Sequence, residues 1–177
     1  RGDITFRAVE ILNKVDVILA EDTRHSKQLL SSLGVQKPMQ SLHAHNEAEK
    51  SEHLLKSLLN GTTFALISDA GTPLINDPGF PLVNLARKNE ISVVPIPGAC
   101  AFIAALSAAG IPSDAFTFSG FLPAKKSARQ NVLDSLKPLM HTLIFYESTH
   151  RIVESLSDIA EVFGPDCQLV LAKELTK

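Results

Sequence analysis

"TFALISDAGTPLINDPG" (Thr63 to Gly79) is the stretch of this sequence that decides the fold. Its first five residues form an apolar run that is typical of a strand buried on both faces. The next twelve residues hold two glycines, two prolines, two aspartates and an asparagine, which are the residues of turns. A buried strand that ends in turn-forming residues, with the carboxylate of Asp69 at its mouth, indicates either a surface turn or the edge of a small-molecule site.

The same alternation of strand and helix patterns runs along the whole chain. Short apolar runs predict strands over 16–20, 39–45, 63–68, 91–96, 116–121, 142–147 and 168–174. Apolar residues at helical spacing predict helices over 4–15, 26–34, 46–61, 79–89, 99–110, 126–138 and 148–164. At the start of the helix over 46–61, Asn46 is expected to be the N-cap and Glu49 to complete a capping box. This order of elements predicts an α/β fold with parallel or mixed sheets that are covered on both faces.

Residues 95–98 ("PIPG") are the expected domain boundary, because two prolines and a glycine suit neither a helix nor a strand. We therefore expect an N-terminal α/β domain over 1–95 and a C-terminal α/β domain over 96–177. The sequence opens on a helix pattern and stops directly after a strand pattern. An α/β sheet normally opens with a strand, so we expect a fold truncated at both ends, with the first and the last strands missing.

Composition and charge limit the class of protein. Hydrophobic residues make up 45% and charged residues 20% of the 177 residues, as in soluble globular proteins. No apolar run is long enough to span a bilayer, and the N-terminal residues lack the pattern of a signal peptide. Cys100 and Cys167 are far apart and have no partners at metal-ligand spacing, which favours a reducing, cytoplasmic setting. The net charge of −2 does not by itself indicate nucleic-acid binding, although a local basic patch is compatible with it.

Four of the predicted strands end in polar or charged residues. These clusters are Glu21–Arg24, Ser68–Pro73, Glu147–Arg151 and Lys173–Lys177. Ligands of open α/β sheets bind outside the carboxyl ends of the strands. If the strands are parallel, the four clusters gather on one edge, and this convergence indicates a site more strongly than any single cluster does.

Two of these clusters also have a structural interpretation. Asp69 can bond its own backbone in an Asx turn that leads to a helix. Asp22 can be a helix cap beside a solvated Arg24. Neither a Walker phosphate loop nor a G-x-G-x-x-G dinucleotide loop is present, and no Ser-His-Asp order or nucleophile elbow is visible.

Other polar stretches remain open to two interpretations as well. "FLPAKKSARQ" brings Lys125, Lys126 and Arg129 together, either as a solvated helix start or as contacts to the phosphates of a nucleic acid. His43 and His45 have no third ligand at standard spacing, so "HAHNE" indicates a polar loop and helix cap and not a metal site. The residues alone thus indicate a cytoplasmic α/β enzyme with a small-molecule site around 69–73 and 95–98.

A set of longer motifs is recognisable in order and spacing. They are "GDITFRA", "AEDTR", "HNE", "ALISDAGTPLINDPG", "PIPGACA", "GFLPAK", "LIFYESTHR" and "KELTK". Together they cover nearly the whole chain, and with them the sequence closely resembles the bacterial ribosomal small-subunit methyltransferase I family. The resemblance implies the tetrapyrrole-methylase-like fold, also called the class III S-adenosylmethionine methyltransferase fold, with two α/β domains and the cofactor in the cleft between them.

The resemblance also implies an activity and a cofactor site. The expected reaction is methylation of the ribose 2′-hydroxyl of a cytidine in the decoding region of 16S rRNA, with S-adenosyl-L-methionine as cofactor. The expected partners are 16S rRNA or the small ribosomal subunit and a second copy of the protein in a homodimer, without a membrane. "SDAGTP" looks like the counterpart of the Gly-Asp-Pro cofactor loop of related methylases. The expected cofactor-binding residues are Ser68, Asp69, Ala70, Gly71, Thr72, Pro73, Pro97, Gly98, Ala99, Cys100 and Tyr146.

The chemistry calls for a proton acceptor, because a ribose hydroxyl is a poor nucleophile. The candidates are Glu21, Asp22, Asp69, Glu147 and Glu174. Asp22 and Glu147 are preferred as catalytic residues, since each ends a strand beside an arginine. That arginine also lowers a carboxyl pKa and weakens it as a base, so either residue can instead orient the RNA or brace the site.

The expected RNA contacts are Arg24, Lys125, Lys126 and Arg129. Two other functions stay open on the sequence. One is a methylase of the same fold that acts on a tetrapyrrole or another metabolite. The other is a non-catalytic module that binds the cofactor or RNA.

Overall fold

The computed structural model describes residues 2–176, and the chain forms two compact units that divide after Cys100. Each unit has its own parallel sheet. The assignment of 1–95 and 96–177 as domains stays a prediction.

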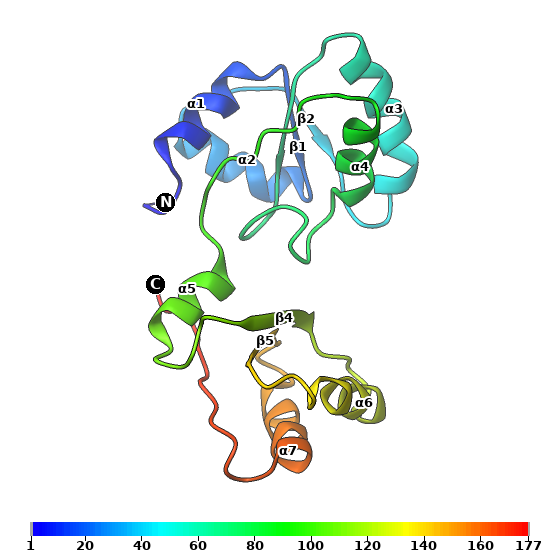
Figure 1. The fold of residues 1–177 in the computed structure, drawn as a ribbon. Helices are drawn as coiled ribbons and strands as arrows, with labels where there is room; N and C mark the ends of the chain where they lie inside the picture. The colour runs from blue at the N-terminus through cyan, green and yellow to red at the C-terminus, as the bar shows by residue number, and fades with distance from the viewer. Residues whose placement is uncertain (1, 177) are drawn as a thin grey trace. The chain divides into compact units, whose positions relative to one another are not determined.

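The first unit is a three-stranded parallel sheet with the strand order β2-β1-β3. Its strands are β1 (Val17–Ala20), β2 (Met39–Ser41) and β3 (Phe64–Ile67), and its helices are α1 (Phe6–Lys14), α2 (Thr23–Ser32), α3 (Glu47–Leu59) and α4 (Phe80–Lys88). Figure 1 shows α1 and α2 on one side of this sheet and α3 and α4 on the other. The α/β class with parallel strands is confirmed.

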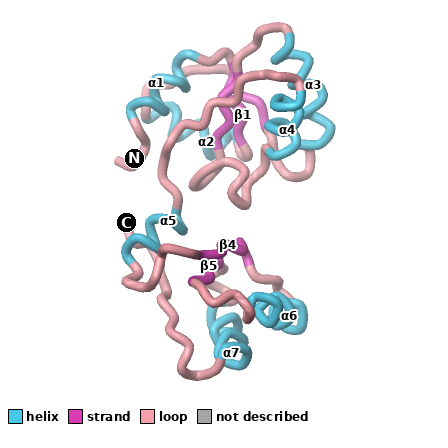
Figure 2. The backbone as a smooth tube through the Cα atoms, viewed as in Figure 1, coloured by secondary structure: helices cyan, strands magenta, loops and turns pink. Residues whose placement is uncertain are grey.

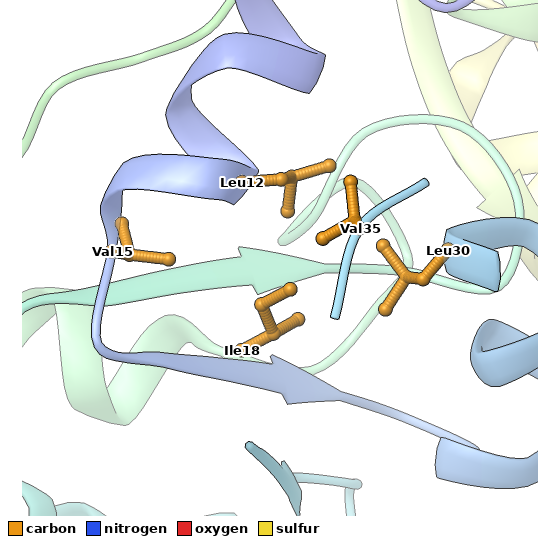
Figure 3. Packing of buried hydrophobic residues seen from close by; sticks show 5 residues of the cluster. All are labelled: Leu12, Val15, Ile18, Leu30 and Val35. Carbon is orange, nitrogen blue, oxygen red and sulfur yellow. The ribbon is translucent and has the colours of Figure 1, made fainter. Parts of the chain in front are cut away.

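Alternate residues of β1 build the two halves of the core. Ile18 points to the side of α1 and α2, where Leu12, Val15, Leu30 and Val35 converge on it (Figure 3). Its neighbour Leu19 faces the opposite side and packs against Leu42, Leu54 and Leu82. Successive side chains of a strand point to opposite faces, so a continuous apolar run is what a strand covered on both faces requires.

The second unit is built on two parallel strands, β4 (Phe116–Phe121) and β5 (Thr142–Tyr146). Its helices are α5 (Ala101–Ala108), α6 (Lys126–Leu136) and α7 (Ile152–Phe163). Phe102 of α5 stacks on Phe118 of β4 with ring centroids 4.4 Å apart, and Phe118 meets Tyr146 of β5 edge-on at 4.8 Å. These aromatic contacts join α5 to the sheet.

Two predicted strands do not form among residues 2–176. Residues 91–96 and 168–174 belong to no ladder, and Figure 2 draws both as loop. Val94 and Leu171 are each 59% exposed. Their apolar composition suits a strand, but a strand also needs a neighbour with which to exchange hydrogen bonds, and neither segment has one among the described residues.

The predicted capping box of α3 is also wrong. Asn46 is the N-cap, but its side chain makes no cap hydrogen bond. Instead, its Oδ1 accepts from the backbone N–H of His43 at 2.9 Å. The first residue of α3, Glu47, uses its carboxylate to accept a hydrogen bond from the backbone N–H of Gly79 at 2.6 Å. The side chain of Asn46 thus stabilises the loop before α3, and the side chain of Glu47 joins the start of α3 to the start of α4.

Among the described residues, no helix has the length and apolar character needed to cross a bilayer.

Candidate functional site

The carboxyl ends of β1 and β3 lie side by side and bring two of the predicted clusters together. The strands pair in parallel, with Ala20 opposite Ile67 at their last residues. Directly beyond them, the backbone N–H of Asp22 donates to Oδ1 of Asp69 at 3.4 Å. The cluster after β5 belongs to the second unit, and the one at 173–177 follows no strand among the described residues.

The loop from Ser68 to Gly79 has an unusual backbone. Gly71, Leu74, Asn76 and Gly79 all have positive φ, at 79°, 70°, 65° and 125°. This conformation is strained for a residue with a side chain such as Leu74. The hydroxyl of Ser68 donates to the carbonyls of Ala70 and Gly71, each at 3.3 Å. The turn residues therefore fold the chain into a tight loop at the sheet edge.

The loop after β3 contacts the segment that contains "PIPGAC". Thr72 Oγ1 donates to the carbonyl of Ala99 at 3.3 Å. Two residues earlier in that segment, the carbonyl of Pro97 accepts from Thr5 Oγ1, the N-cap hydroxyl of α1, at 3.5 Å. Both stretches predicted to bind a cofactor are thus held together within the first unit. Figure 2 shows them as loops.

Glycines show which parts of these loops face open space. A Cβ at Gly71 or at Gly98 meets no atom within 4 Å. A Cβ at Gly79 would overlap the side chain of Leu66, so that end of the loop is packed on the sheet. The backbone at 71 and 98 is therefore not covered by other described residues, and its role in holding a cofactor stays a prediction.

Other predicted cofactor contacts are less directly placed. Cys100 ends the first unit and is partly buried. Tyr146 belongs to the second unit, where its ring contacts Phe118 and Phe121 with centroids at 4.8 and 5.5 Å. Both assignments stay predictions.

Asp22 is the N-cap of α2. Its side chain accepts hydrogen bonds from the backbone of Arg24 and His25, and it pairs with the Arg24 guanidinium at 3.0 Å. The side-chain bond from Arg24, followed by the backbone bonds, lowers the pKa of Asp22 to about 2. Asp22 is therefore a weak proton acceptor, and the structural interpretation of this residue is the better supported one.

Glu21, directly before it, has the opposite environment. Burial, and then the negative charges of Asp69 and Asp77, raise the pKa of Glu21. Burial also raises the pKa of Asp77, where a hydrogen bond with Ser68 opposes the shift and the charge of Asp69 adds to it. Asp77 was not among the predicted site residues. The sequence feature that could have revealed Asp77 is the "NDPG" turn, which brings the chain back to the carboxyl end of β3.

His43 adds a histidine in a fixed tautomer beside these carboxylates. Because Asn46 Oδ1 accepts from the His43 backbone, its Nδ2 must be the donor that meets His43 Nε2 at 2.9 Å. The proton of the neutral ring is then on Nδ1. That atom is buried and has no hydrogen-bond partner among the described residues.

Glu147 has both carboxylate oxygens occupied. Oε1 accepts from the backbone N–H of Ser148 at 2.7 Å and pairs with Arg151 at 2.8 Å, and Oε2 accepts from Ser155 Oγ at 2.5 Å. Burial raises the pKa of Glu147, but these three partners together lower it. The side chain braces the start of α7, which argues against a role as base.

The cations predicted to contact RNA divide into different groups. Arg24 and Lys125 are exposed. Lys126 is exposed but pairs with Glu161 at 3.1 Å. Arg129 is only 1% exposed and pairs with Asp158, so its predicted phosphate contact is wrong in this structure. Its partner lies in a different helix, which the local sequence pattern did not reveal.

No group of three His, Cys, Asp or Glu side chains is arranged to hold a metal ion within residues 2–176.

Comparisons with known proteins identify the relatives of this chain. The family model of tetrapyrrole (corrin/porphyrin) methylases matches residues 1–177. Proteins named ribosomal RNA small subunit methyltransferase I are 57% identical over 175 residues in Haemophilus influenzae, 55% over 176 in Escherichia coli O157:H7 and 52% over 175 in Pseudomonas aeruginosa. Each alignment covers 99% of this chain and 62% of the relative, so the chain spans less than two thirds of their length.

A solved structure shares the fold. The crystal structure of uroporphyrin-III-C-methyltransferase from Thermus thermophilus matches with a TM-score of 0.59 and 19% identity. The match covers 92% of this chain and 67% of that one.

Proposed function

We propose, since the chain belongs to the tetrapyrrole (corrin/porphyrin) methylase family, that the whole protein is a methyltransferase acting on the RNA of the small ribosomal subunit. The finer assignment is to the ribose 2′-hydroxyl of a cytidine in the decoding region of 16S rRNA, as the resemblance of the motifs implies. The observation that carries the proposal is the 52–57% identity to ribosomal RNA small subunit methyltransferases I across 99% of this chain. We place the activity in the cytoplasm and expect a homodimer.

Two features of the loops of the first unit support S-adenosyl-L-methionine as the cofactor. Its amino-acid and ribose groups need polar backbone atoms at close range, and Gly71 and Gly98 offer backbone that faces open space. The bond from Thr72 to Ala99 holds Ser68–Pro73 against Pro97–Cys100. These residues would hold the cofactor, which supplies a methyl group on a sulfonium.

Glu21 is the carboxylate best suited to accept the proton of the ribose hydroxyl. Its carboxylate accepts no hydrogen bond from residues 2–176, and its pKa is raised chiefly by burial. By contrast, the Asp22 and Glu147 carboxylates are engaged by arginines and backbone amides. A base with a raised pKa keeps more proton affinity at neutral pH. Asp69 and Asp77 sustain this raised pKa through their charges.

The contribution of the remaining residues is orientation. Displacement at a methyl carbon requires the attacking oxygen, the carbon and the leaving sulfur in line, and positioning of this kind supplies at most roughly 7–11 kcal/mol. The paired loops fix one side of that line. Arg24 and Lys125 are the exposed cations proposed to contact the RNA backbone.

A second candidate is methylation of a small tetrapyrrole, which the fold shared with uroporphyrin-III-C-methyltransferase favours. The two are separated by supplying the whole protein with methyl-labelled S-adenosylmethionine and either unmethylated small ribosomal subunits or uroporphyrinogen III. Label in the 16S rRNA alone is expected. Label in the porphyrin alone would overturn the proposal, and cofactor binding without turnover on either acceptor would identify a non-catalytic module.

A further inference from the structure

The most deeply buried ion pair of the second unit joins α6 to α7. Arg129 and Asp158 are each 1% exposed, and Nε of Arg129 lies 2.5 Å from Oδ2 of Asp158. The other carboxylate oxygen, Oδ1, accepts from Gln130 at 3.1 Å. Glu154 lies 3.6 Å from Nη2 of the same guanidinium. A buried charge is tolerated only when it is paired in this way.

The guanidinium also holds the backbone that precedes α6. Nη1 of Arg129 donates to the carbonyls of Pro123 and Ala124, at 3.3 and 3.0 Å. Lys125, the next residue, is the N-cap position of α6. Arginine is suited to this task because the donors of its planar guanidinium are spread over three nitrogens and reach a carboxylate and two carbonyls in different directions, whereas all three donors of lysine lie on one atom.

The three cations of "AKKSAR" therefore differ in what they leave for a ligand. Arg129 is neutralised by Asp158 and Glu154. Lys126 lies 3.1 Å from Glu161 and 3.6 Å from Asp158. Lys125 is exposed and forms no ion pair with residues 2–176. Of these three cations, only Lys125 carries a positive charge that no acidic side chain of residues 2–176 balances.

We propose that Arg129 is a positioning residue that clamps the Pro123–Ala124 backbone so that Lys125 is presented as a phosphate contact for the RNA. This inference rests on the proposed function and names the part of the second unit that receives the RNA. Arg129 acts through Lys125 and does not touch the RNA itself. Lys126 is already paired with Glu161 and is not assigned a phosphate contact.

A double-mutant cycle in the whole protein tests the coupling. The variants are Lys125→Ala, Arg129→Lys and the double variant, with affinity for a 16S rRNA fragment measured over a range of salt concentrations. Lys125→Ala is expected to weaken binding several-fold and to reduce the slope of log affinity against log salt by about 0.7–1, the share of one phosphate contact. Arg129→Lys is expected to weaken binding in the same way, but to add nothing when Lys125 is already alanine. Independent, additive losses would overturn the inference.

Lys137→Ala is the matched control. Lys137 is an exposed lysine at the other end of α6, paired with Asp134 at 3.1 Å. Its loss removes the same charge from the same helix and is expected to leave RNA affinity unchanged. Lys125→Arg is expected to restore binding, because any cation at the clamped position can meet a phosphate.

If Arg129→Lys does not fold, two single variants, Lys125→Ala and Lys126→Ala, test the inference. Lys125→Ala is expected to lose more RNA affinity than Lys126→Ala, and an equal or larger loss at Lys126 would overturn it. Binding of S-adenosylmethionine, measured by calorimetry, is expected to be unchanged in both.

If the unaltered protein methylates rRNA while Lys125→Ala binds it normally, this inference fails alone. If the unaltered protein does not methylate rRNA, the proposed function fails.

Discussion

At the scale of single residues, the neighbours Glu21 and Asp22 have carboxyl groups in opposite environments. Glu21 is partly buried among Asp69 and Asp77, which raises its pKa, whereas Arg24 and two backbone amides lower the pKa of Asp22 to about 2. One is suited to take up a proton and the other to stay ionised. Adjacent residues of the same chemical class therefore have different expected roles, and each role has its own test.

Glu21→Gln is expected to lower kcat by roughly 10²–10⁴-fold, the usual contribution of a general base. Cofactor affinity, measured by calorimetry, is expected to be nearly unchanged. In the unaltered protein, activity is expected to fall as pH falls through the raised pKa of Glu21, because the base must be ionised to act. The matched control is Glu52→Gln, which alters an exposed carboxylate of α3. A glutamine variant at 21 with full activity would rule out Glu21 as the base.

Asp22→Ala is expected to lower the melting temperature instead, because it removes the N-cap of α2. The folded-state pKa lies below the ordinary 3.8, so the ionised carboxylate stabilises the fold above 3.8 and this is lost as pH falls towards about 2. The difference in melting temperature between the two proteins is therefore expected to be smaller at about pH 3 than at about pH 7. A difference that does not change with pH would contradict the capping account.

At the scale of elements, two glycines separate the effect of backbone strain from the effect on a ligand. Gly71 in the loop after β3 and Gly34 after α2 have similar positive φ, 79° and 71°, and a Cβ at either meets no atom within 4 Å. Alanine at either position carries a comparable strain of roughly 1–2 kcal/mol. Only Gly71→Ala is expected to weaken S-adenosylmethionine binding in calorimetry. Equal cofactor affinities in the two variants would remove the loop from the site.

The sequence predicted the helices and most strands, because their signals are local. Helical spacing and apolar runs located every helix and the five strands that form. The prediction failed where the local structure depends on a contact with another segment of the chain. Residues 91–96 ("ISVVPI") are largely apolar but have no neighbouring strand among the described residues. Asn46 stands at the N-cap of α3, but its side chain makes no cap hydrogen bond because its Oδ1 accepts from the backbone of His43.

The candidate site likewise has features that the sequence predicts and features that depend on residues distant in the sequence. The convergence of the β1 and β3 ends follows from parallel pairing and could be predicted. The roles of individual charges could not. In "AKKSAR", Arg129 resembles a solvated cation like the neighbouring lysines. In the structure it is buried and forms an ion pair with Asp158 of the following helix. The raised pKa of Glu21 comes from burial first and then from the charges of Asp69 and Asp77, the second of which a turn of the loop brings back to the strand end.

At the scale of the whole molecule, the cofactor is expected to stabilise the fold. The proposed contacts at Ser68–Pro73 and Pro97–Cys100 exist only when the loops are folded, so the ligand binds the native state. S-adenosylmethionine at a hundred times its Kd is expected to add about 2.7 kcal/mol to the free energy of unfolding. Gly98→Leu places a side chain in open space, so it is expected to keep the melting temperature of the free protein and to abolish the increase. An increase that persists in this variant would contradict the proposed site.

The most direct test of the central claim is the position of the methyl group on the RNA. Small-subunit rRNA treated with the whole protein and S-adenosylmethionine is partially hydrolysed in alkali and resolved as a ladder. Alkaline cleavage needs a free 2′-hydroxyl, so one missing band at a cytidine of the decoding region is the expected result. A complete ladder from RNA that has taken up label would place the methyl group on a base and contradict the account.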